Sequence, residues 1–363
     1  MVFNRYQFAQ RQLALIIPAH NEEVVIADTI RSAMTAGQLA ADIFVVSDGS
    51  KDTTVAIATE LLGAQQVLDQ PQSGKAKAIL HAIKHFEIEK RYRWVHVADA
   101  DGVFHPSYFR ELHARLNPQW VAATGYVQSL NGGWISKYRA YEYTFGLEIL
   151  RRIQAFLGTI PVIPGPTSIF RTDIIKQLDF TVDSLTEDMD LTLQIHRQKL
   201  GKIGYIPQAK TYTQDPKDLA DYTKQISRWY RGNFQVMQRH RVGLHAQKID
   251  AYLAYVMLEQ WILIAQLIVV PFWAWWGQNY NFLAVVFLND VIISFLITAW
   301  AASKAQRPDM LGAFPLFYVL RFVCLAIFVR SWFEIVVQRK FRTAEPGWST
   351  AGRRYRIATN AVN

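Results

Sequence analysis

The chain has 363 residues, enough for one soluble domain of about 200–250 residues plus an appendage. Its formal net charge is +9, but the basic residues gather beside apolar runs, so we expect a membrane surface and no nucleic-acid partner. The single cysteine, Cys324, lies within an apolar run, which excludes a disulfide framework.

The chain up to about residue 215 alternates short apolar runs with helical stretches. Strands are expected at LALII (13–17), IFVV (43–46), WVHV (94–97) and WVAATGYVQ (120–128), and helices at 22–37 and 52–63. This order predicts an α/β domain with a mostly parallel sheet that is covered on both faces. Ligands bind such sheets at the carboxyl ends of the strands, where this chain has PAHNEE (18–23), SDGSKD (47–52) and DAD (99–101).

The DAD segment places two carboxylates two residues apart at a strand end. Asp99 and Asp101 should therefore point to one side, where they would favour Mg²⁺ or Mn²⁺ completed by phosphate oxygens. The alternative is a polar exit from the strand with Asp101 as a helix cap.

Turn chemistry accounts for part of SDGSKD. Gly49 permits a tight turn, and Ser50 and Asp52 are expected to cap the following helix. Asp48, at the strand end, is better placed to accept a hydrogen bond from a base or sugar. Lys75 either meets a phosphate or carboxylate or is a solvated helix lysine.

The segment SLTEDMD (184–190) begins another helix, and KIGYIPQAKTYTQDP (202–216) is expected to form two short strands. Ser184 and Glu187 have the spacing of a capping box. That interpretation leaves Asp188 unexplained, and a carboxylate near a sugar hydroxyl could act as a general base.

The segment QISRW (225–229) has helical spacing. Gln225, Arg228 and Trp229 fall on one helix face, where Gln and Arg suit diphosphate oxygens and Trp offers a flat plate for a sugar ring. The alternative is a basic amphipathic helix on a membrane surface, anchored by Trp229.

From residue 251 onward the chain turns apolar, with runs at 251–276, 281–300 and 312–337. Each has about the 20 residues that cross a bilayer core. We expect a catalytic domain at 1–245, a membrane region of about three helices at 246–337 and a basic tail at 338–363. Three spans from a cytoplasmic start would put that tail outside, against the positive-inside rule. The third run holds Arg321, Arg330 and Glu334, so it either faces a polar channel or partner, or one run lies in the interface.

The motifs PAHNEE, SDGSKD, DAD, TED and QISRW, in this order, resemble the membrane-bound family 2 inverting glycosyltransferases of the polysaccharide-synthase type. That group includes cellulose, chitin, hyaluronan and poly-N-acetylglucosamine synthases, and the resemblance covers about residues 12–245 plus the apolar runs. It implies a GT-A-type nucleotide-sugar fold, a UDP-sugar donor, a glycan or lipid acceptor, and Mg²⁺ or Mn²⁺.

The resemblance also implies residue roles. Metal binding is expected at Asp101, acceptor binding at Trp229, and catalysis at Asp188 with Glu187 beside it. The residues expected to bind the donor are Pro18, Ala19, Glu22, Asp48, Lys75, Asp99, Gln225 and Arg228. The stretch 164–175 is similar to the family's acceptor-side segment. Two departures are expected: no membrane helix ahead of the catalytic domain, and Ser-Asp where a pair of aspartates is common.

These features predict a multi-pass enzyme of the cell membrane with a cytoplasmic catalytic domain. It would transfer a sugar with inversion to form a β-glycoside in polysaccharide synthesis, alone, as a homo-oligomer or with a partner membrane protein. Two alternatives stay open: transfer of one sugar to a lipid, as in ceramide glucosyltransferase, and a catalytically inactive scaffold.

Overall fold

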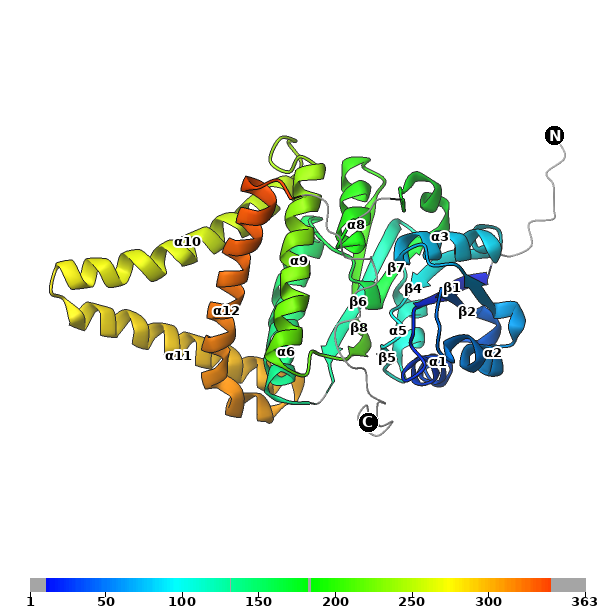
Figure 1. Ribbon diagram of the computed structural model, residues 1–363, viewed down its shortest axis with the longest axis horizontal. Coiled ribbons are helices and arrows are strands. Elements are labelled where there is room, and N and C mark those ends of the chain that lie inside the picture. Colours follow the sequence, from blue (N-terminus) through cyan, green and yellow to red (C-terminus); the bar gives the residue numbers. More distant parts are fainter. Residues whose placement is uncertain (1–10, 131, 182–183, 341–363) are drawn as a thin grey trace. The chain divides into compact units, whose positions relative to one another are not determined.

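The computed structural model describes residues 11–130, 132–181 and 184–340 (Figure 1). Within these residues the chain divides into two compact units, one holding residues up to 130 and 160–214, the other 132–159 and 215–340. The expected tail beyond residue 340 lies outside the described residues. The boundary expected near residue 245 stays a prediction, and among the described residues 132–159 and 215–245 belong to the same compact unit as the apolar helices.

In the described part of the chain, the first unit is built on an eight-stranded sheet with the order β3-β2-β1-β4-β7-β6-β8-β5. The strands are β1 Arg11–Ala19, β2 Ile43–Asp48, β3 Val67–Gln70, β4 Tyr92–Val97, β5 Val103–Phe104, β6 Trp120–Ser129, β7 Ser168–Arg171 and β8 Lys202–Thr213. The first four strands in this order are parallel to their neighbours, whereas β7 runs antiparallel to β4 and β6, and β5 runs antiparallel to β8. The α/β fold class is confirmed. In the parallel half of the sheet, β1, β2 and β4 end at the same edge.

Helices cover both faces of the parallel half. The helices of this unit are α1 Ile26–Thr35, α2 Thr54–Leu62, α3 Lys75–His85, α4 Ile88–Arg91, α5 Tyr108–Arg115 and α8 Glu187–Arg197, with shorter 3₁₀ turns η1 Ala40–Asp42, η2 Ala64–Gln66, η4 Gly165–Thr167 and η5 Thr172–Gln177. Residues of α1, α2 and α5 join one buried cluster with alternate residues of β1. Because strand side chains alternate, Phe44 of β2 points to the other face, where it contacts Phe86 after α3 with ring centroids 4.7 Å apart.

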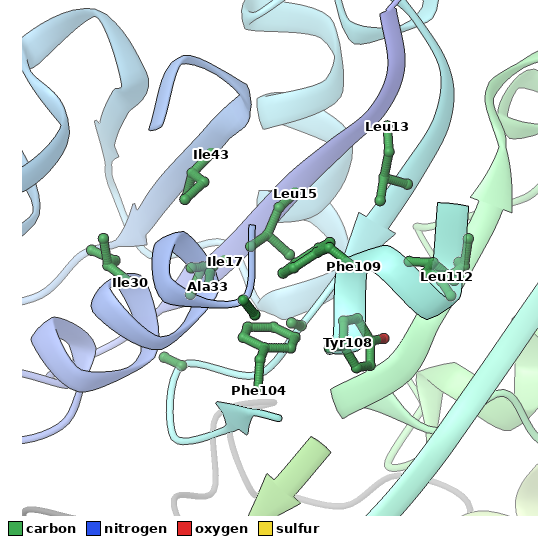
Figure 2. Close-up of a cluster of buried hydrophobic side chains, with 14 of the residues drawn as sticks. Leu13, Leu15, Ile17, Ile30, Ala33, Ile43, Phe104, Tyr108, Phe109 and Leu112 are labelled. Atoms are coloured by element: carbon green, nitrogen blue, oxygen red, sulfur yellow. The ribbon is translucent and has the colours of Figure 1, made fainter. Parts of the chain in front are cut away.

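The buried cluster explains why the LALII run forms the central strand. Figure 2 shows Leu13, Leu15 and Ile17 of β1 on the side where Phe109 and Leu112 of α5 lie. The intervening residues of β1 are buried too, so an uninterrupted apolar run suits this position.

Within the stretch 202–216, residues 202–213 form one strand, β8, where two short strands were expected. Its pairing with β6 nevertheless breaks: Thr124 lies opposite Tyr205, and Tyr126 lies opposite Lys210. Pro207 stands in the skipped part of β8, and proline lacks the N–H that a ladder needs. The break expected in this stretch is therefore present as an irregularity in the pairing of β8 with β6. It does not divide β8 into two strands.

Two expected helix caps are corrected. Helix α8 begins at Glu187 with Thr186 before it, and Ser184 Oγ accepts from the Thr186 N–H, so no capping box forms. At α2, Asp52 accepts from the Thr54 N–H as expected.

The other predicted cap residue of α2, Ser50, bonds elsewhere. Its hydroxyl accepts from the N–H of Asn21 at 3.1 Å, in the neighbouring loop. The Ser50 hydroxyl is thus used by a tertiary contact that local spacing does not reveal, whereas the Ser184 hydroxyl bonds only two residues ahead.

The second unit is helical. Its helices are α6 Trp134–Phe145, η3 Gly146–Leu150, α7 Arg151–Leu157, α9 Leu219–Arg239, α10 Lys248–Trp276, α11 Tyr280–Ala305, η6 Pro308–Ala313, α12 Phe314–Trp332 and η7 Phe333–Val337. As expected, the three apolar runs form helices: within the described residues, three helical segments (248–276, 280–305 and 308–337) are long and apolar enough to cross a membrane. The third is the most buried inside the unit, because α12 packs along α9.

The charged residues of the third apolar run have partners within the unit. Arg321 Nη1 lies 3.1 Å from both carboxylate oxygens of Asp290 on α11. Arg330 Nε donates to Glu334 at 2.8 Å, and Arg231 of α9 lies 3.5 Å from the same carboxylate. A polar channel is therefore not required to account for these charges.

Leu112→Ala is expected to lower the free energy of unfolding by about 2–5 kcal/mol, because the side chain is fully buried in the cluster of Figure 2. The matched control is Leu39→Ala in the same unit, where Leu39 is 65% exposed and the change should stay within about 0.5 kcal/mol. Denaturant unfolding of the purified protein in detergent measures both. Equal effects would contradict this placement of the core.

Candidate active site

The loops after β1 and β2 are joined by reciprocal hydrogen bonds. The N–H of Asn21 donates to Ser50 Oγ, and the Asn21 side-chain oxygen accepts from the N–H of Lys51 at 2.8 Å. The N–H of Glu22 donates to Thr54 Oγ1 at 2.8 Å. The parallel strands β1 and β2 deliver these loops to one sheet edge, where the hydrogen bonds hold PAHNEE and SDGSKD together.

The residues expected to shape a nucleoside pocket lie at this edge. Pro18 and Ala19 are the last residues of β1, and both are buried. Glu22 is 1% exposed and follows in the loop. Their contact with a nucleoside stays a prediction.

Asp48 organises the segment that leads into α3. It is fully buried, and one carboxylate oxygen accepts from Gln70 Nε2 at 2.9 Å and from the Ser73 N–H at 2.8 Å. The other accepts from the Gly74 N–H at 2.8 Å. Hydrogen bonds to an ionised acceptor are the stronger kind, so this carboxylate sets where α3 and its first residue, Lys75, begin. Its expected contact with a base stays a prediction.

Lys75 joins two motifs that are far apart in the sequence. Its Nζ lies 2.7 Å from Asp99 Oδ1 and 3.0 Å from Glu187 Oε1. The three side chains are 19%, 29% and 22% exposed, so the ion pairs are largely shielded from water. Burial alone would lower the pKa of Lys75, but the two carboxylates raise it well above its usual value, and the ammonium stays charged.

Gly165 allows the backbone to approach this ion pair. A Cβ at this position would lie 2.9 Å from both carboxylate oxygens of Asp99 and 3.1 Å from Lys75 Nζ. The segment is held in place by Ser168, whose hydroxyl donates to the carbonyls of Ile163 and Pro164. The stretch 164–175 thus contributes a close backbone contact to the site.

Asp188 lies in the first turn of α8, beside Glu187. One of its carboxylate oxygens accepts from the Met189 N–H at 2.8 Å. Thr192, one turn later, donates to the Asp188 carbonyl at 2.6 Å and accepts from the Ile163 N–H at 3.0 Å. The start of α8 is therefore bonded to the segment that carries Gly165, and Asp188 is half-buried at that point.

His96, on β4 below the DAD segment, is a structural residue. It is fully buried, and burial lowers its pKa to about 3. Its Nε2 lies 3.2 Å from the Tyr108 hydroxyl. A neutral, inaccessible imidazole of this kind supports the strand and does not exchange protons with a ligand.

The residue expected to bind a metal, Asp101, lies in the turn after β4. Among the described residues, no three His, Cys, Asp or Glu side chains gather in a way that could hold a metal ion. Asp101 is half-buried in the turn after β4. Mg²⁺ in proteins is usually held by one or two carboxylates together with substrate phosphates and water, and metal binding by Asp101 stays a prediction.

In the second unit, QISRW lies within one continuous helix, α9, as expected. Tyr222, Ile226 and Phe234 form its buried face, and Phe234 packs on Phe328 of α12 with ring centroids 5.4 Å apart. The helix begins at the cap residue Asp218, whose side chain accepts from the Asp221 N–H.

The predicted residues of this motif, Gln225, Arg228 and Trp229, are all half-buried. The ring of Trp229 lies 4.9 Å from the guanidinium carbon of Arg139 on α6. Trp229 therefore packs against a residue of its own unit. A tryptophan that served only as a membrane anchor would not need this contact.

Within the first unit, the structure brings Lys75, Asp99 and Glu187 into direct contact, with Asp188 adjacent in sequence to Glu187. Sequence reasoning missed the part played by Gly165, although PGP is an unusual enough tripeptide to suggest a special backbone path. It also missed Arg139, for which the surrounding WISKYRAYEYTF segment offered only an arginine among aromatic residues.

Comparison with known proteins identifies the class. The family model described as "Glycosyltransferase like family 2" matches residues 10–232, and the chain belongs to this family. It is similar to the poly-beta-1,6-N-acetyl-D-glucosamine synthase of Staphylococcus epidermidis, at 25% identity over 327 residues, covering 83% of this chain and 77% of that protein. The synthase of the same name from Staphylococcus aureus strain COL is 24% identical over 266 residues, covering 71% and 63%.

A solved structure supports the fold. The mannosyltransferase PcManGT from Pyrobaculum calidifontis, in complex with GDP-Man and Mn²⁺, has a TM-score of 0.56 and covers 85% of this chain and 87% of its own. Its identity is 14%, so this likeness concerns the fold, and it confirms the expected GT-A-type architecture. The protein is thus a family 2 glycosyltransferase with a GT-A-type domain and three apolar helices in its described part that could span a membrane.

Gly165→Ala is expected to separate Lys75 from Asp99, because the new Cβ would be closer to the carboxylate than side chains normally approach. Because the atoms that the new Cβ would meet are the ends of the Asp99 and Lys75 side chains, the main effect should be a displaced ion pair and a loss of sugar-transfer activity of up to about 10²-fold, measured as nucleotide release. The matched control is Gly146→Ala, since a Cβ at Gly146 meets nothing within 4 Å among the described residues. Wild-type stability and activity in Gly165→Ala would contradict the close approach.

Proposed function

We propose that this protein is a membrane-bound, metal-dependent inverting glycosyltransferase of polysaccharide synthesis. It transfers a hexosyl or N-acetylhexosaminyl group from a UDP-sugar to a hydroxyl acceptor and forms a β-glycosidic bond. The observation that carries the proposal is the contact of Lys75 with both Asp99 and Glu187, which joins the DAD and TED motifs at the sheet edge of a family 2 domain. The similarity to poly-N-acetylglucosamine synthases supports the polymer product.

The proposed donor roles are those that the family resemblance implies. Pro18, Ala19, Glu22 and Asp48 serve the nucleoside, and Lys75, Asp99, Gln225 and Arg228 serve the diphosphate side. Ammonium and guanidinium groups are the usual partners of phosphate oxygens, and arginine binds them through a planar fork. The Lys75 ammonium, already held by two carboxylates, is preorganised and charged for this role.

Transfer follows a single displacement. The acceptor hydroxyl attacks the anomeric carbon from the face opposite the diphosphate and gives its proton to the Asp188 carboxylate. The bond between the anomeric carbon and the diphosphate oxygen breaks, and UDP leaves with the electron pair. Inversion converts an α-linked donor into a β-glycoside, while Gln225 and Arg228 stabilise the charge that develops on the diphosphate.

A divalent cation held by Asp101 would supply further compensation for the diphosphate charge. The Mn²⁺ in the mannosyltransferase complex is consistent with such a cation. Glu187 assists Asp188 indirectly, because its contact with Lys75 fixes the first turn of α8 on which Asp188 lies.

The three apolar helices of the described residues support a location of this chemistry at a membrane. We propose a multi-pass protein of the cell membrane with the catalytic domain in the cytoplasm, where nucleotide sugars are made. The expected homo-oligomer or partner membrane protein stays a prediction.

The function is tested with the full chain in detergent or nanodiscs, by measuring UDP release from UDP-glucose, UDP-N-acetylglucosamine and UDP-glucuronic acid and the size of the product. One donor should give a long polymer, and Asp188→Asn should lower transfer by about 10²–10⁴-fold without weakening UDP binding. The control Asp69→Asn alters an exposed carboxylate on β3 and should be neutral. Normal turnover by Asp188→Asn would refute the base assignment, and a single glycolipid product would favour transfer to a lipid.

Asp101→Ala is expected to abolish the part of UDP binding that depends on Mn²⁺, because it removes the carboxylate proposed to hold the cation. Calorimetric titration of UDP with Mn²⁺ or with EDTA measures this dependence. Asp69→Asn again serves as the control. An unchanged Mn²⁺-dependent affinity in Asp101→Ala would show that the cation is held elsewhere.

A further inference from the structure

A buried arginine lies in the second unit, outside every motif that sequence reasoning selected. Arg139 stands on α6, and its side chain is 4% exposed. Charged groups are rarely buried unless they are paired, because their transfer from water is costly. The groups around the Arg139 guanidinium should therefore show how its charge is balanced and which side chains it holds in place.

Arg139 is held by a set of polar groups. Its Nη1 donates to Glu142 Oε2 at 2.5 Å, and its Nη2 donates to the Tyr143 hydroxyl at 2.7 Å. The Asp215 carboxylate lies 3.8 Å from Nε and also accepts from the Ser136 hydroxyl at 2.9 Å. Burial alone would lower the pKa of Arg139, but these neighbours raise it, so the cation is permanent.

The guanidinium of Arg139 also lies over two aromatic rings. Its central carbon lies 4.4 Å from the centroid of the Tyr143 ring and 4.9 Å from that of the Trp229 ring. A cation over the face of tryptophan is attracted by the ring, and more strongly where water is excluded. Trp229 is half-buried. One part of its side chain is in contact with Arg139, and another part is accessible to solvent.

Stability alone is a weak reason to keep this arrangement. Replacing a buried ion pair by apolar side chains is often neutral or stabilising, whereas a planar cation fixed on three sides holds its neighbour in one orientation. Lysine would preserve the charge but not the plane. Arginine can bond Glu142 and Tyr143 through separate N–H groups while its central carbon lies over the Trp229 ring, and lysine cannot do both in the same way.

We infer that Arg139 is a positioning residue for acceptor binding, which it serves by holding the indole plane of Trp229. This inference rests on the proposed function, in which Trp229 forms the floor of the acceptor site. Sugar rings bind through their apolar faces to flat aromatic plates, so a tilt of the indole changes acceptor binding. Small misplacements of a binding group are known to cost up to about 10²-fold in rate.

The test is a double-mutant cycle with Arg139→Lys and Trp229→Ala in the full chain. UDP-N-acetylglucosamine serves as donor and a β-1,6-linked N-acetylglucosamine oligosaccharide as acceptor, chosen from the names of the relatives. Arg139→Lys should raise the acceptor KM about 10- to 100-fold and leave UDP release without acceptor unchanged. In the Trp229→Ala background, Arg139→Lys should have no further effect.

Two further variants separate positioning from general damage. Tyr143→Phe removes only the hydroxyl that accepts from Arg139 and should shift the acceptor KM less, in the same direction. The control Arg152→Lys alters the arginine of an exposed ion pair with Glu148 on the neighbouring helix and should be neutral. Thermal unfolding checks that all variants are folded.

The outcomes are distinct. Effects of Arg139→Lys and Trp229→Ala that multiply, or a parallel loss of UDP release and transfer, would overturn the positioning role while the proposed function stands. A folded wild-type protein that releases no UDP from any donor would overturn the proposed function and this inference together.

Discussion

The ammonium of Lys75 is the contact on which the candidate site of the first unit depends. It lies between carboxylates from two motifs that are about 90 residues apart in the chain, Asp99 and Glu187. Without it, two carboxylates would lie close together in a partly buried place with no lysine ammonium between them. The buried Asp48 sets the start of α3, and Gly165 leaves room for the pair.

The second unit also contains charged side chains in surroundings that are partly shielded from water. Its helices are mostly apolar, and some of the charges that lie among them pair within the unit, as at Asp290 with Arg321. Arg139 differs from this pair because part of its contact is with aromatic faces. The same kind of cation thus neutralises a carboxylate in one place and orients a ring in another.

Much of the fold was predictable from the sequence. Continuous apolar runs such as LALII indicated strands buried on both faces, and the runs beyond residue 251 indicated helices of membrane length. The errors were local. Ser50 and Ser184 have the right spacing for caps, but spacing cannot show that the Ser50 hydroxyl bonds a loop 29 residues away or that the Glu187 carboxylate bonds Lys75.

By itself, the sequence determined the family, the α/β class and the motif residues, because residue type and order along the chain carry that information. Only the tertiary structure decided which charged groups meet. Lys75 could have been a solvated helix lysine, and Arg139 gave no signal at all, since the partners of both come from segments far away in the chain. The physical reason is that the energy of an ion pair or a stacked ring depends on distance and burial in space, which sequence spacing does not encode.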